Sequence, residues 1–429
     1  MEEWISTSAT RMLSALQARE ISSEELVSAC LRRIAEVNPQ INAVVQLAPE
    51  AALARARELD ALSAQGRSAG PLHGLPFTAK DIFETAGIIS SAGLEERENF
   101  IPQRDAVVVK RMKDAGAILL GKTNCPPGGA GGETTNLIYG ATRNPYHRDY
   151  SPGGSSGGEA AIIAAAGSPL GLGSDSGGSI RLPAHYCGIA GMRPTSGRVP
   201  ATGAYGLAGG LSDPRSQVGP MARYVEDLAL MLPILFGEDW SDSGVVPMPL
   251  RDSVDVNLSA LRVAFFTDDG VASPTPETVE GVNQSAHCLQ NAGLRVEQSC
   301  PSGIAEAFDI TVNYWRQAEM SGGEIEALLA RWDTFRSRML GFMRGCDVLL
   351  CPAAASPAVL CGEGMVQQFS YTLPFSLTGY PAVVVRVGTS PDGLPIGVQV
   401  VARPWREDVA LAVAGKLEKL LGGWQAPPL

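Results

Sequence analysis

Residues 151–183 constrain the fold of this chain more than any other part of its sequence. Two glycine-flanked serine clusters, at residues 153–158 and 175–179, enclose an apolar stretch that is rich in alanine. Residues 158–167 predict a helix of small side chains, and residues 170–172 predict a buried strand. A helix of alanine and isoleucine can pack closely against a sheet. We therefore expect the serine clusters to be tight turns between packed elements and not a flexible linker.

The rest of the chain alternates between helical and strand-like patterns. Ser22 and Glu25 match a capping box at the start of a helix that we expect Pro39 to end. Further helices are predicted at residues 49–63, 105–115 and 406–421, and strands at residues 41–46, 117–120, 261–266, 347–351, 382–387 and 396–401. This alternation is typical of an α/β protein, and we expect one continuous domain.

The composition narrows the classes of function. The 429 residues carry a net charge of −11, without a run of five like charges, which argues against binding to a phosphate backbone. The eight cysteines lack the spacing of a zinc site, so we expect reduced thiols and no metal. The acidic start at Met1 to Glu3 is unlike a signal peptide, and no apolar run has the length of a membrane span. We expect a cytoplasmic protein that binds neither nucleic acid nor membrane.

Residues 116–123 match the expression for a phosphate-binding loop, but their context differs. Such a loop follows a strand and opens a helix. Here the variable positions 117–120 are the apolar strand itself, and Pro126 and Pro127 cannot continue a helix after Thr123. We therefore expect no nucleotide site at Lys122.

Three residues are candidates for catalysis. Lys80 follows the apolar run of residues 75–79, and a lysine that is removed from water loses proton affinity and can act as a general base. Ser155 lies in the first serine cluster, and Ser179 ends the second. Gly177 and Gly178 allow the backbone before Ser179 to turn tightly and to point successive N–H groups at one spot, as an oxyanion hole requires.

Ser156 offers an alternative, because residues 154–158 satisfy the G-x-S-x-G pattern of an α/β-hydrolase nucleophile. Such an enzyme needs a later acid and a later histidine. Only His185 and His287 follow, and neither has a convincing context, so the sequence disfavours this alternative.

Taken together, these residues resemble the amidase signature family of serine hydrolases. Lys80, the cluster at 153–158 and the segment at 167–183 occur in the family's order, with 75 residues from Lys80 to Ser155 and 24 from Ser155 to Ser179. Residues 193–199, 219–227, 378–382 and 393–399 also match. The resemblance covers about residues 6–240 and 345–420, whereas the stretch between them matches no pattern.

The resemblance implies a Ser–cis-Ser–Lys triad. Ser179 would be the nucleophile, Ser155 would relay its proton from a non-proline cis peptide, and neutral Lys80 would be the final base. The oxyanion would be held by the backbone N–H groups of Ser176, Gly177, Gly178 and Ser179, and the loop would be supported from behind by Ser156, Asp175 and Arg181. The implied fold is a single large α/β domain with a mixed, twisted sheet covered by helices on both faces, and no cofactor.

The family pattern also suggests how the chain is divided. N-terminal helices would occupy residues 1–65, the core with the triad 66–235, a variable substrate-side region 236–345, and the strands and helix that complete the sheet 346–429. Substrate contacts are expected from residues 125–132, 205–210 and 369–375. The named candidates among them are Cys125, Gly128, Gly129, Ala130, Gly131, Gly132 and Tyr205.

The expected activity is that of a stand-alone hydrolase of apolar or aryl amides, with carbamates and esters as further substrates, working as a monomer or homodimer. One alternative is the glutamine-hydrolysing subunit of a tRNA-dependent amidotransferase. In that subunit the nucleophile is usually followed by Ile-Arg-Gln-Pro, whereas Leu182 stands here in place of the glutamine. The other alternative is a non-catalytic binding or scaffold protein, which the intact Lys80, Ser155 and Ser179 disfavour.

Overall fold

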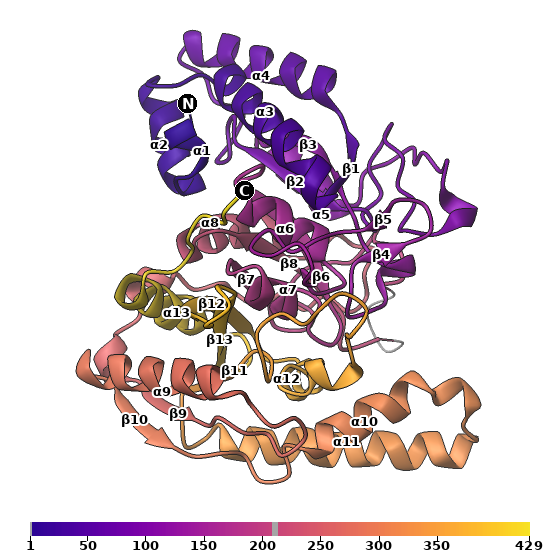
Figure 1. Ribbon diagram of the computed structural model, residues 1–429, viewed down its shortest axis with the longest axis vertical. Helices are drawn as coiled ribbons and strands as arrows, with labels where there is room; N and C mark the ends of the chain where they lie inside the picture. Colours follow the sequence, from indigo (N-terminus) through magenta and orange to yellow (C-terminus); the bar gives the residue numbers. More distant parts are fainter. Residues whose placement is uncertain (1, 208–212) are drawn as a thin grey trace.

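The computed structural model describes residues 2–207 and 213–429, and a large sheet forms its centre (Figure 1). The strands of this sheet are β1 (Val44–Leu47), β2 (Pro76–Lys80), β3 (Ile118–Thr123), β6 (Leu170–Asp175), β7 (Ala190–Arg193), β8 (Gln217–Ala222), β9 (Arg262–Phe265), β10 (Arg295–Gln298), β11 (Val348–Pro352), β12 (Ala382–Thr389) and β13 (Pro395–Ala402). Within the described residues their order is β1-β3-β2-β6-β8-β7-β12-β13-β11-β9-β10. The short strands β4 (Thr135–Asn136) and β5 (Gly140–Ala141) form a separate ribbon.

The sheet is mixed. Strand β2 runs parallel to β3 and β6, and β9 runs parallel to β10 and β11. The remaining neighbours are antiparallel. Lys80 and the second serine cluster therefore lie at the carboxyl ends of neighbouring parallel strands, because Lys80 ends β2 and Asp175 ends β6.

Helices cover both faces of the sheet (Figure 1). They are α1 (Glu2–Ile5), α2 (Ala9–Ala18), α3 (Ser23–Ile41), α4 (Pro49–Ala64), α5 (Val107–Asp114), α6 (Gly157–Ala164), α7 (Arg181–Tyr186), α8 (Val225–Leu235), α9 (Pro276–Asn291), α10 (Glu306–Trp315), α11 (Gly322–Phe342), α12 (Leu373–Thr378) and α13 (Glu407–Leu421). Helices α8, α9 and α13 pack together on one side, and α6 and α7 pack together on β6, β7, β8, β12 and β13. This arrangement confirms the predicted α/β fold of one large domain.

The small-residue helix lies as the sequence predicts. Every residue of α6 is buried, and the helix packs between β6, β8 and α3. A Cβ atom added to Gly158 would lie 2.5 Å from the carbonyl oxygen of Asn124, so the helix comes close to the chain that follows β3. This close approach holds the first serine cluster against the edge of the core.

Two predictions about helix α3, one for its start and one for its end, have opposite outcomes. The capping box is confirmed, since Ser22 Oγ accepts from the Glu25 N–H and the Glu25 carboxylate accepts from the Ser22 N–H. The prediction that Pro39 ends the helix is wrong, because α3 continues to Ile41 and closes at Asn42 with φ of 49°. Pro39 lies in the last turn and removes one N–H donor there, and the helix ends two residues later at Ile41. Strand β1 consequently begins later than predicted, at Val44.

The predicted strand within the phosphate-loop expression is present. Residues 118–123 form β3, and Lys122 is a buried member of that strand. Its ammonium lies 3.2 Å from the Asp81 carboxylate and donates to the Phe83 carbonyl at 2.7 Å. The side chain is therefore bound within the core.

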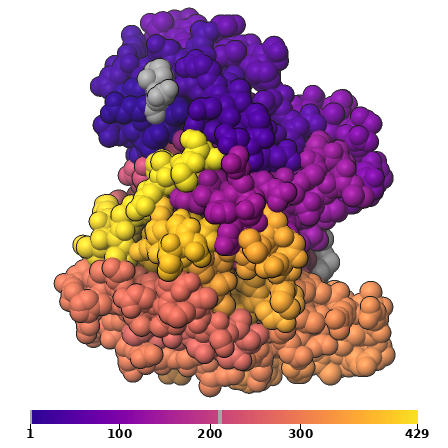
Figure 2. Space-filling model, viewed as in Figure 1, coloured from indigo at the N-terminus to yellow at the C-terminus, as the bar shows by residue number. Residues whose placement is uncertain are grey.

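The segment without a recognisable pattern builds one end of the molecule. Figure 2 shows residues from about 260 to 345 spread along the end opposite to the N-terminal helices. Strands β9 and β10 extend the sheet there, and α10 and α11 form an antiparallel pair (Figure 1). No helix among residues 2–207 and 213–429 combines the length and apolar character needed to cross a bilayer.

Candidate active site

Lys80 lies at the end of β2 with its side chain fully buried. Its ammonium nitrogen is 2.6 Å from Ser155 Oγ and 2.9 Å from Ser174 Oγ. Burial lowers the pKa of Lys80 to about 8, although the nearby Cys125, Asp175 and Glu159 oppose the shift. A buried lysine with hydroxyl neighbours can exchange a proton with them near neutral pH.

Ser155 is positioned by its backbone. The peptide bond between Gly154 and Ser155 is cis, and the next residue, Ser156, precedes helix α6. A Cβ atom on Gly154 would lie 2.7 Å from the carbonyl oxygen of Gly131, so only glycine fits where these two segments meet. The Ser156 N–H donates to the carbonyl of Ser179 at 3.2 Å, which joins the two serine clusters.

The turn that carries Ser179 is anchored by Asp175. Arg181 donates from Nε and Nη2 to the two oxygens of this carboxylate, both at 2.9 Å, and Arg193 lies 3.8 Å from it. Burial opposes ionisation of Asp175, but the arginines hold its pKa below the ordinary value. The Ile180 N–H also donates to Asp175 at 3.2 Å. Asp175 thereby closes the ends of the turn on each other.

The amides of this turn are available as donors. Among the described residues, no acceptor is bonded to the N–H groups of Ser176, Gly177, Gly178 and Ser179. Gly178 has a φ of 140°, and a Cβ atom there would lie 2.3 Å from Thr372 Oγ1. The Ser179 hydroxyl, which is partly exposed, makes no hydrogen bond to another described residue. A cluster of N–H groups beside a hydroxyl suits the stabilisation of an oxyanion.

A cleft of about 730 Å³ opens over this turn and over the loop after β3. Its described walls are residues Pro126, Pro127, Gly128, Gly129, Ala130, Gly131, Gly132, Glu133, Thr135, Ser176, Gly177, Ser179, Gly206, Leu207, Asp213, Arg215, Trp315, Gly364, Met365, Val366, Gln368 and Phe369. Five of the named substrate candidates, at residues 128–132, are among them. Residues 208–210, which belong to the predicted 205–210 set, lie outside the described residues.

Two of the seven named substrate candidates, and residues 370–375 of the wider prediction, do not line the described cleft. Cys125 is fully buried behind the loop, because the chain turns inward directly after β3, and burial raises the pKa of its thiol to about 12. The Tyr205 ring is covered by the guanidinium of Arg97, whose central carbon lies 4.6 Å from the ring centroid. Its neighbours Gly206 and Leu207 line the cleft instead.

Several other cleft residues had no signal in the sequence. Asp213 and Arg215 precede β8, and Trp315 ends α10 in the segment without a recognisable pattern. Sequence reasoning also missed Ser174, whose hydroxyl is the second hydrogen-bond partner of Lys80. Ser174 lies inside the segment at 167–183, and the signal that could have indicated it was its position directly before Asp175.

Ser156 does not meet the needs of an α/β-hydrolase nucleophile. Its side chain is fully buried, and its hydroxyl donates to the carbonyl of Ser174 at 3.3 Å. His185 is buried elsewhere, where its ring nitrogens contact the backbone carbonyls of Gly397 and Ser356. The structure therefore agrees with the sequence in disfavouring this alternative.

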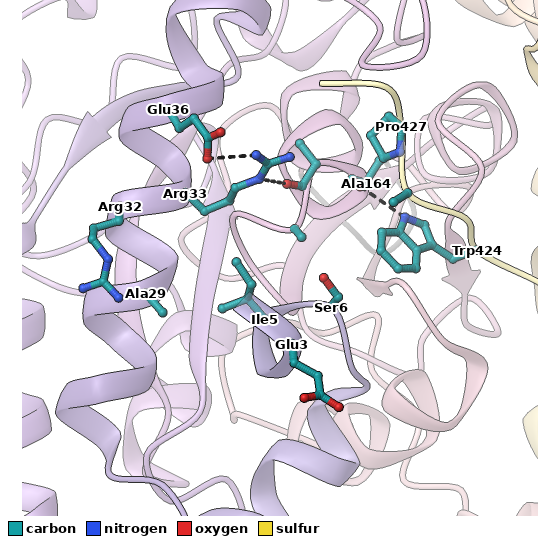
Figure 3. Close-up of a pocket in the computed structure, with 13 residues that line it drawn as sticks. Glu3, Ile5, Ser6, Ala29, Arg32, Arg33, Glu36, Ala164, Trp424 and Pro427 are labelled. Carbon is teal, nitrogen blue, oxygen red and sulfur yellow. Dashed lines mark hydrogen bonds and ion pairs between the residues drawn. The ribbon is translucent and has the colours of Figure 1, made fainter. Parts of the chain in front are cut away.

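A second hollow, of about 840 Å³, lies between α3 and the C-terminal tail (Figure 3). Arg33 bridges it by donating to the Ala165 carbonyl at 2.9 Å and pairing with Glu36, and the Trp424 ring donates to the Ala164 carbonyl. Lys80, Ser155 and Ser179 are not among its walls. The cleft over the serine turn is therefore the candidate active site.

Comparisons with known proteins agree with this fold. The chain matches the family model described as Amidase over residues 25–324 and 313–411. It is 32% identical to the acylamidase of Rhodococcus erythropolis, over 97% of this chain and 95% of the relative. It is 34% identical to the A-type subunit of glutamyl-tRNA(Gln) amidotransferase from Chloroflexus aurantiacus, over 96% of each. The solved structure of 6-aminohexanoate cyclic dimer hydrolase in complex with substrate has a TM-score of 0.86 at 30% identity, over 97% of each chain.

These findings define the class as hydrolases that cleave the C–N bond of amides. Within that class, the chain belongs to the amidase family. Its sequence identity to an acylamidase and to an amidotransferase subunit is nearly equal. Sequence identity therefore does not separate these two kinds of substrate, and the residues of the cleft are the basis for a proposal.

Proposed function

We propose that the protein is a stand-alone hydrolase of apolar or aryl amides that works through Ser179, Ser155 and Lys80. The observation that carries the proposal is the contact of 2.6 Å between buried Lys80 and Ser155, beside a turn whose Ser179 lines the cleft. A lysine whose pKa is lowered to about 8 by burial can hold a useful neutral fraction near neutral pH.

The proposed reaction proceeds through an acyl-enzyme. Ser179 Oγ attacks the amide carbonyl as its proton passes to Ser155, and the proton of Ser155 passes to Lys80. The N–H groups of residues 176–179 stabilise the oxyanion. When the C–N bond breaks, the proton returns from Lys80 through Ser155 to the leaving amine. Water then attacks the ester on Ser179, which releases the acid and restores the hydroxyl.

The cleft supports the choice of apolar substrates. Leu207, Trp315, Met365, Val366 and Phe369 contribute hydrocarbon to its walls. A volume of about 730 Å³ is ordinary for a site that holds a small molecule. Carbamates and esters belong to the same proposal, since their carbonyl carbon can meet the same nucleophile and the same N–H groups.

A second candidate is a glutamine-hydrolysing subunit of an amidotransferase, which the 34% identity over 96% of the chain favours. The presence of Leu182 after the nucleophile supports the first candidate instead. In the second case, partner chains would be needed for the complete reaction.

The test compares purified wild type with Ser179→Ala on an aryl amide, an aryl carbamate and glutamine, with release of amine or ammonia as the readout. Turnover of the amide or carbamate that is lost in Ser179→Ala supports the first candidate. Turnover of glutamine alone supports the second. Turnover that survives Ser179→Ala refutes the nucleophile, and inactivity on all three substrates favours a non-catalytic protein.

A further inference from the structure

The described walls of the cleft hold one cation, the guanidinium of Arg215. Arg215 is 4% exposed and lies just before β8. The next residue, Ser216, shares a hydrogen bond with Ser176 of the serine turn. Arg215 is thus close in the chain and in space to the turn that ends in the proposed nucleophile, and a role for it in substrate binding rests on the proposed function.

The Arg215 side chain is held in place from three sides. Its carbonyl accepts a hydrogen bond from Arg193 Nη2 at 2.6 Å, which fixes the backbone. The guanidinium carbon lies 4.1 Å from the ring centroid of Tyr314, and Nε lies 3.3 Å from Asp213 Oδ1. Stacking and a neighbouring carboxylate keep the planar group in one position.

Apart from the Asp213 carboxylate that lies 3.3 Å from Nε, the donors of this guanidinium have no acceptor among the described residues. No nitrogen of the Arg215 side chain donates a hydrogen bond to another described residue, and Nε and Nη1 are both shielded from solvent. Asp213 also accepts from Ser216 Oγ and from the Arg215 backbone, so its oxygens are shared. Buried donors without acceptors are costly, which suggests that their acceptor arrives with a ligand.

Other buried arginines of the chain differ in this respect. In Arg193 and Arg223 only Nε lacks a partner, and Arg181 donates from Nε and both Nη atoms. None of these three lines the described cleft. Arg215, in which both Nε and Nη1 lack a hydrogen bond within the part of the chain that the structure describes, therefore differs from them and lies at the wall of the candidate active site.

We propose that Arg215 determines specificity by binding a carboxylate that the substrate amide carries. A planar guanidinium forms two parallel hydrogen bonds with a carboxylate, whereas a neutral carbonyl offers one acceptor atom. The Trp315 ring stands beside the same turn, since a Cβ atom on Gly177 would lie 3.5 Å from it. The substrate class is thus an amide with a hydrocarbon or aryl body and a terminal carboxylate.

The test uses two anilides that differ at one end: the mono-anilide of glutaric acid, and pentananilide, in which a methyl group replaces the carboxylate. Aniline release gives kcat/KM for wild type, Arg215→Met and Arg215→Lys. We expect kcat/KM of wild type to be ~100-fold higher for the anionic anilide than for pentananilide, mainly through KM. The reason is that pentananilide cannot form the charged hydrogen-bonded pair with Arg215. Arg215→Met should bring the ratio of the two values close to one, and Arg215→Lys should restore part of it.

Arg97→Met is the matched control, because Arg97 stacks on rings outside the cleft and should not change the ratio. Melting curves verify that each variant is folded. A wild-type ratio near one, or a preference that survives Arg215→Met, overturns the proposal while amide hydrolysis itself stands.

If wild type turns over neither anilide, the proposed function fails and binding decides the role of Arg215. Calorimetry with folded Ser179→Ala protein then compares the same two molecules, with and without Arg215→Met. Binding of the anionic anilide that depends on Arg215 supports the carboxylate site. Equal binding of both anilides, or binding of neither, overturns it.

Discussion

Lys80 predicts how catalysis depends on pH. Burial lowers its pKa from 10.5 to about 8. As the proposed base it acts only when neutral, so kcat/KM should rise with pH. With a pKa of about 8, roughly a tenth of Lys80 is neutral at pH 7 and roughly nine tenths at pH 9. We expect kcat/KM to increase ~10-fold per pH unit well below pH 8 and to level off above about pH 9.

Glu159 allows the cause of this rise to be tested. Its buried carboxylate is bonded to the hydroxyls of Thr78 and Thr123, and burial raises its pKa to about 7. When ionised, it favours the charged form of Lys80. Glu159→Gln removes that charge, so the pKa of Lys80 should fall. The rise of kcat/KM with pH should then occur at lower pH. A fall of half a pKa unit would raise kcat/KM at pH 7 roughly threefold.

The assay measures aniline release from pentananilide, which has no ionisable group over the range from about pH 5.5 to 10. Circular dichroism verifies the fold at each pH, and Ser179→Ala supplies the background rate. Glu36→Gln is the matched control, because Glu36 is an exposed acid on α3 that pairs with Arg33. A flat profile, a rate that falls with pH, or a shift to higher pH in Glu159→Gln would refute the reasoning.

Three further predictions concern residues of the same site. Lys80→Met should abolish turnover but increase the free energy of unfolding at pH 7 by ~2 kcal/mol in urea, since it removes a buried charge. This gain should shrink between pH 8 and 10.5, where wild type becomes more stable because its folded state binds fewer protons than its unfolded state. Asp175→Asn should lower the free energy of unfolding by ~3–5 kcal/mol in the same assay, because Arg181 loses its buried partner. Gly129→Ala should lower kcat in the anilide assay, because its Cβ atom would lie 3.0 Å from Ile82 and 3.6 Å from Lys80 Nζ at a φ of 70°.

Each of these has an outcome that contradicts it. Lys80→Met with unchanged or reduced stability at pH 7 would mean that the charge costs the fold nothing. Asp175→Asn with wild-type stability would show that Arg181 finds other acceptors. Gly129→Ala with full kcat would show that the loop moves away from Lys80; Gly237→Ala, where a Cβ atom meets nothing within 4 Å, is the control for strain at positive φ.

The residues proposed for the chemistry could be named from the sequence because their signals are local. Lys80, Ser155 and Ser179 each lie in a short motif whose glycines or apolar neighbours are adjacent in the chain. The register of β2 beside β6 brings Lys80 next to the second serine cluster, and the packing of α6 on these strands adds the first cluster. Residues 128–132 were expected at the cleft from their position in the family pattern, and they follow β3 directly in the chain.

The walls of the cleft were not predictable in the same way. Arg215 and Trp315 come from separate elements, and their meeting depends on how α10 packs beside the turn before β8. Cys125 is buried and does not line the described cleft, and the sequence could not show this because the direction of a side chain near a strand changes with one residue of register. The sequence likewise could not tell that Pro39 falls within the last helical turn.

The two buried lysines of the neighbouring strands explain why only one is suited to be a base. In the pairing of β2 with β3, Lys122 lies beside Ala79 and Lys80 beside Thr123. Lys122 has the Asp81 carboxylate at 3.2 Å, which stabilises its ammonium. Lys80 has only hydroxyl groups as hydrogen-bond partners among the described residues, and these can accept or donate a proton. Burial lowers the pKa of both lysines, but in Lys122 the hydrogen-bonded Asp81 carboxylate opposes this shift. Lys80 lacks such a partner, and we therefore expect it to be the better base of the two.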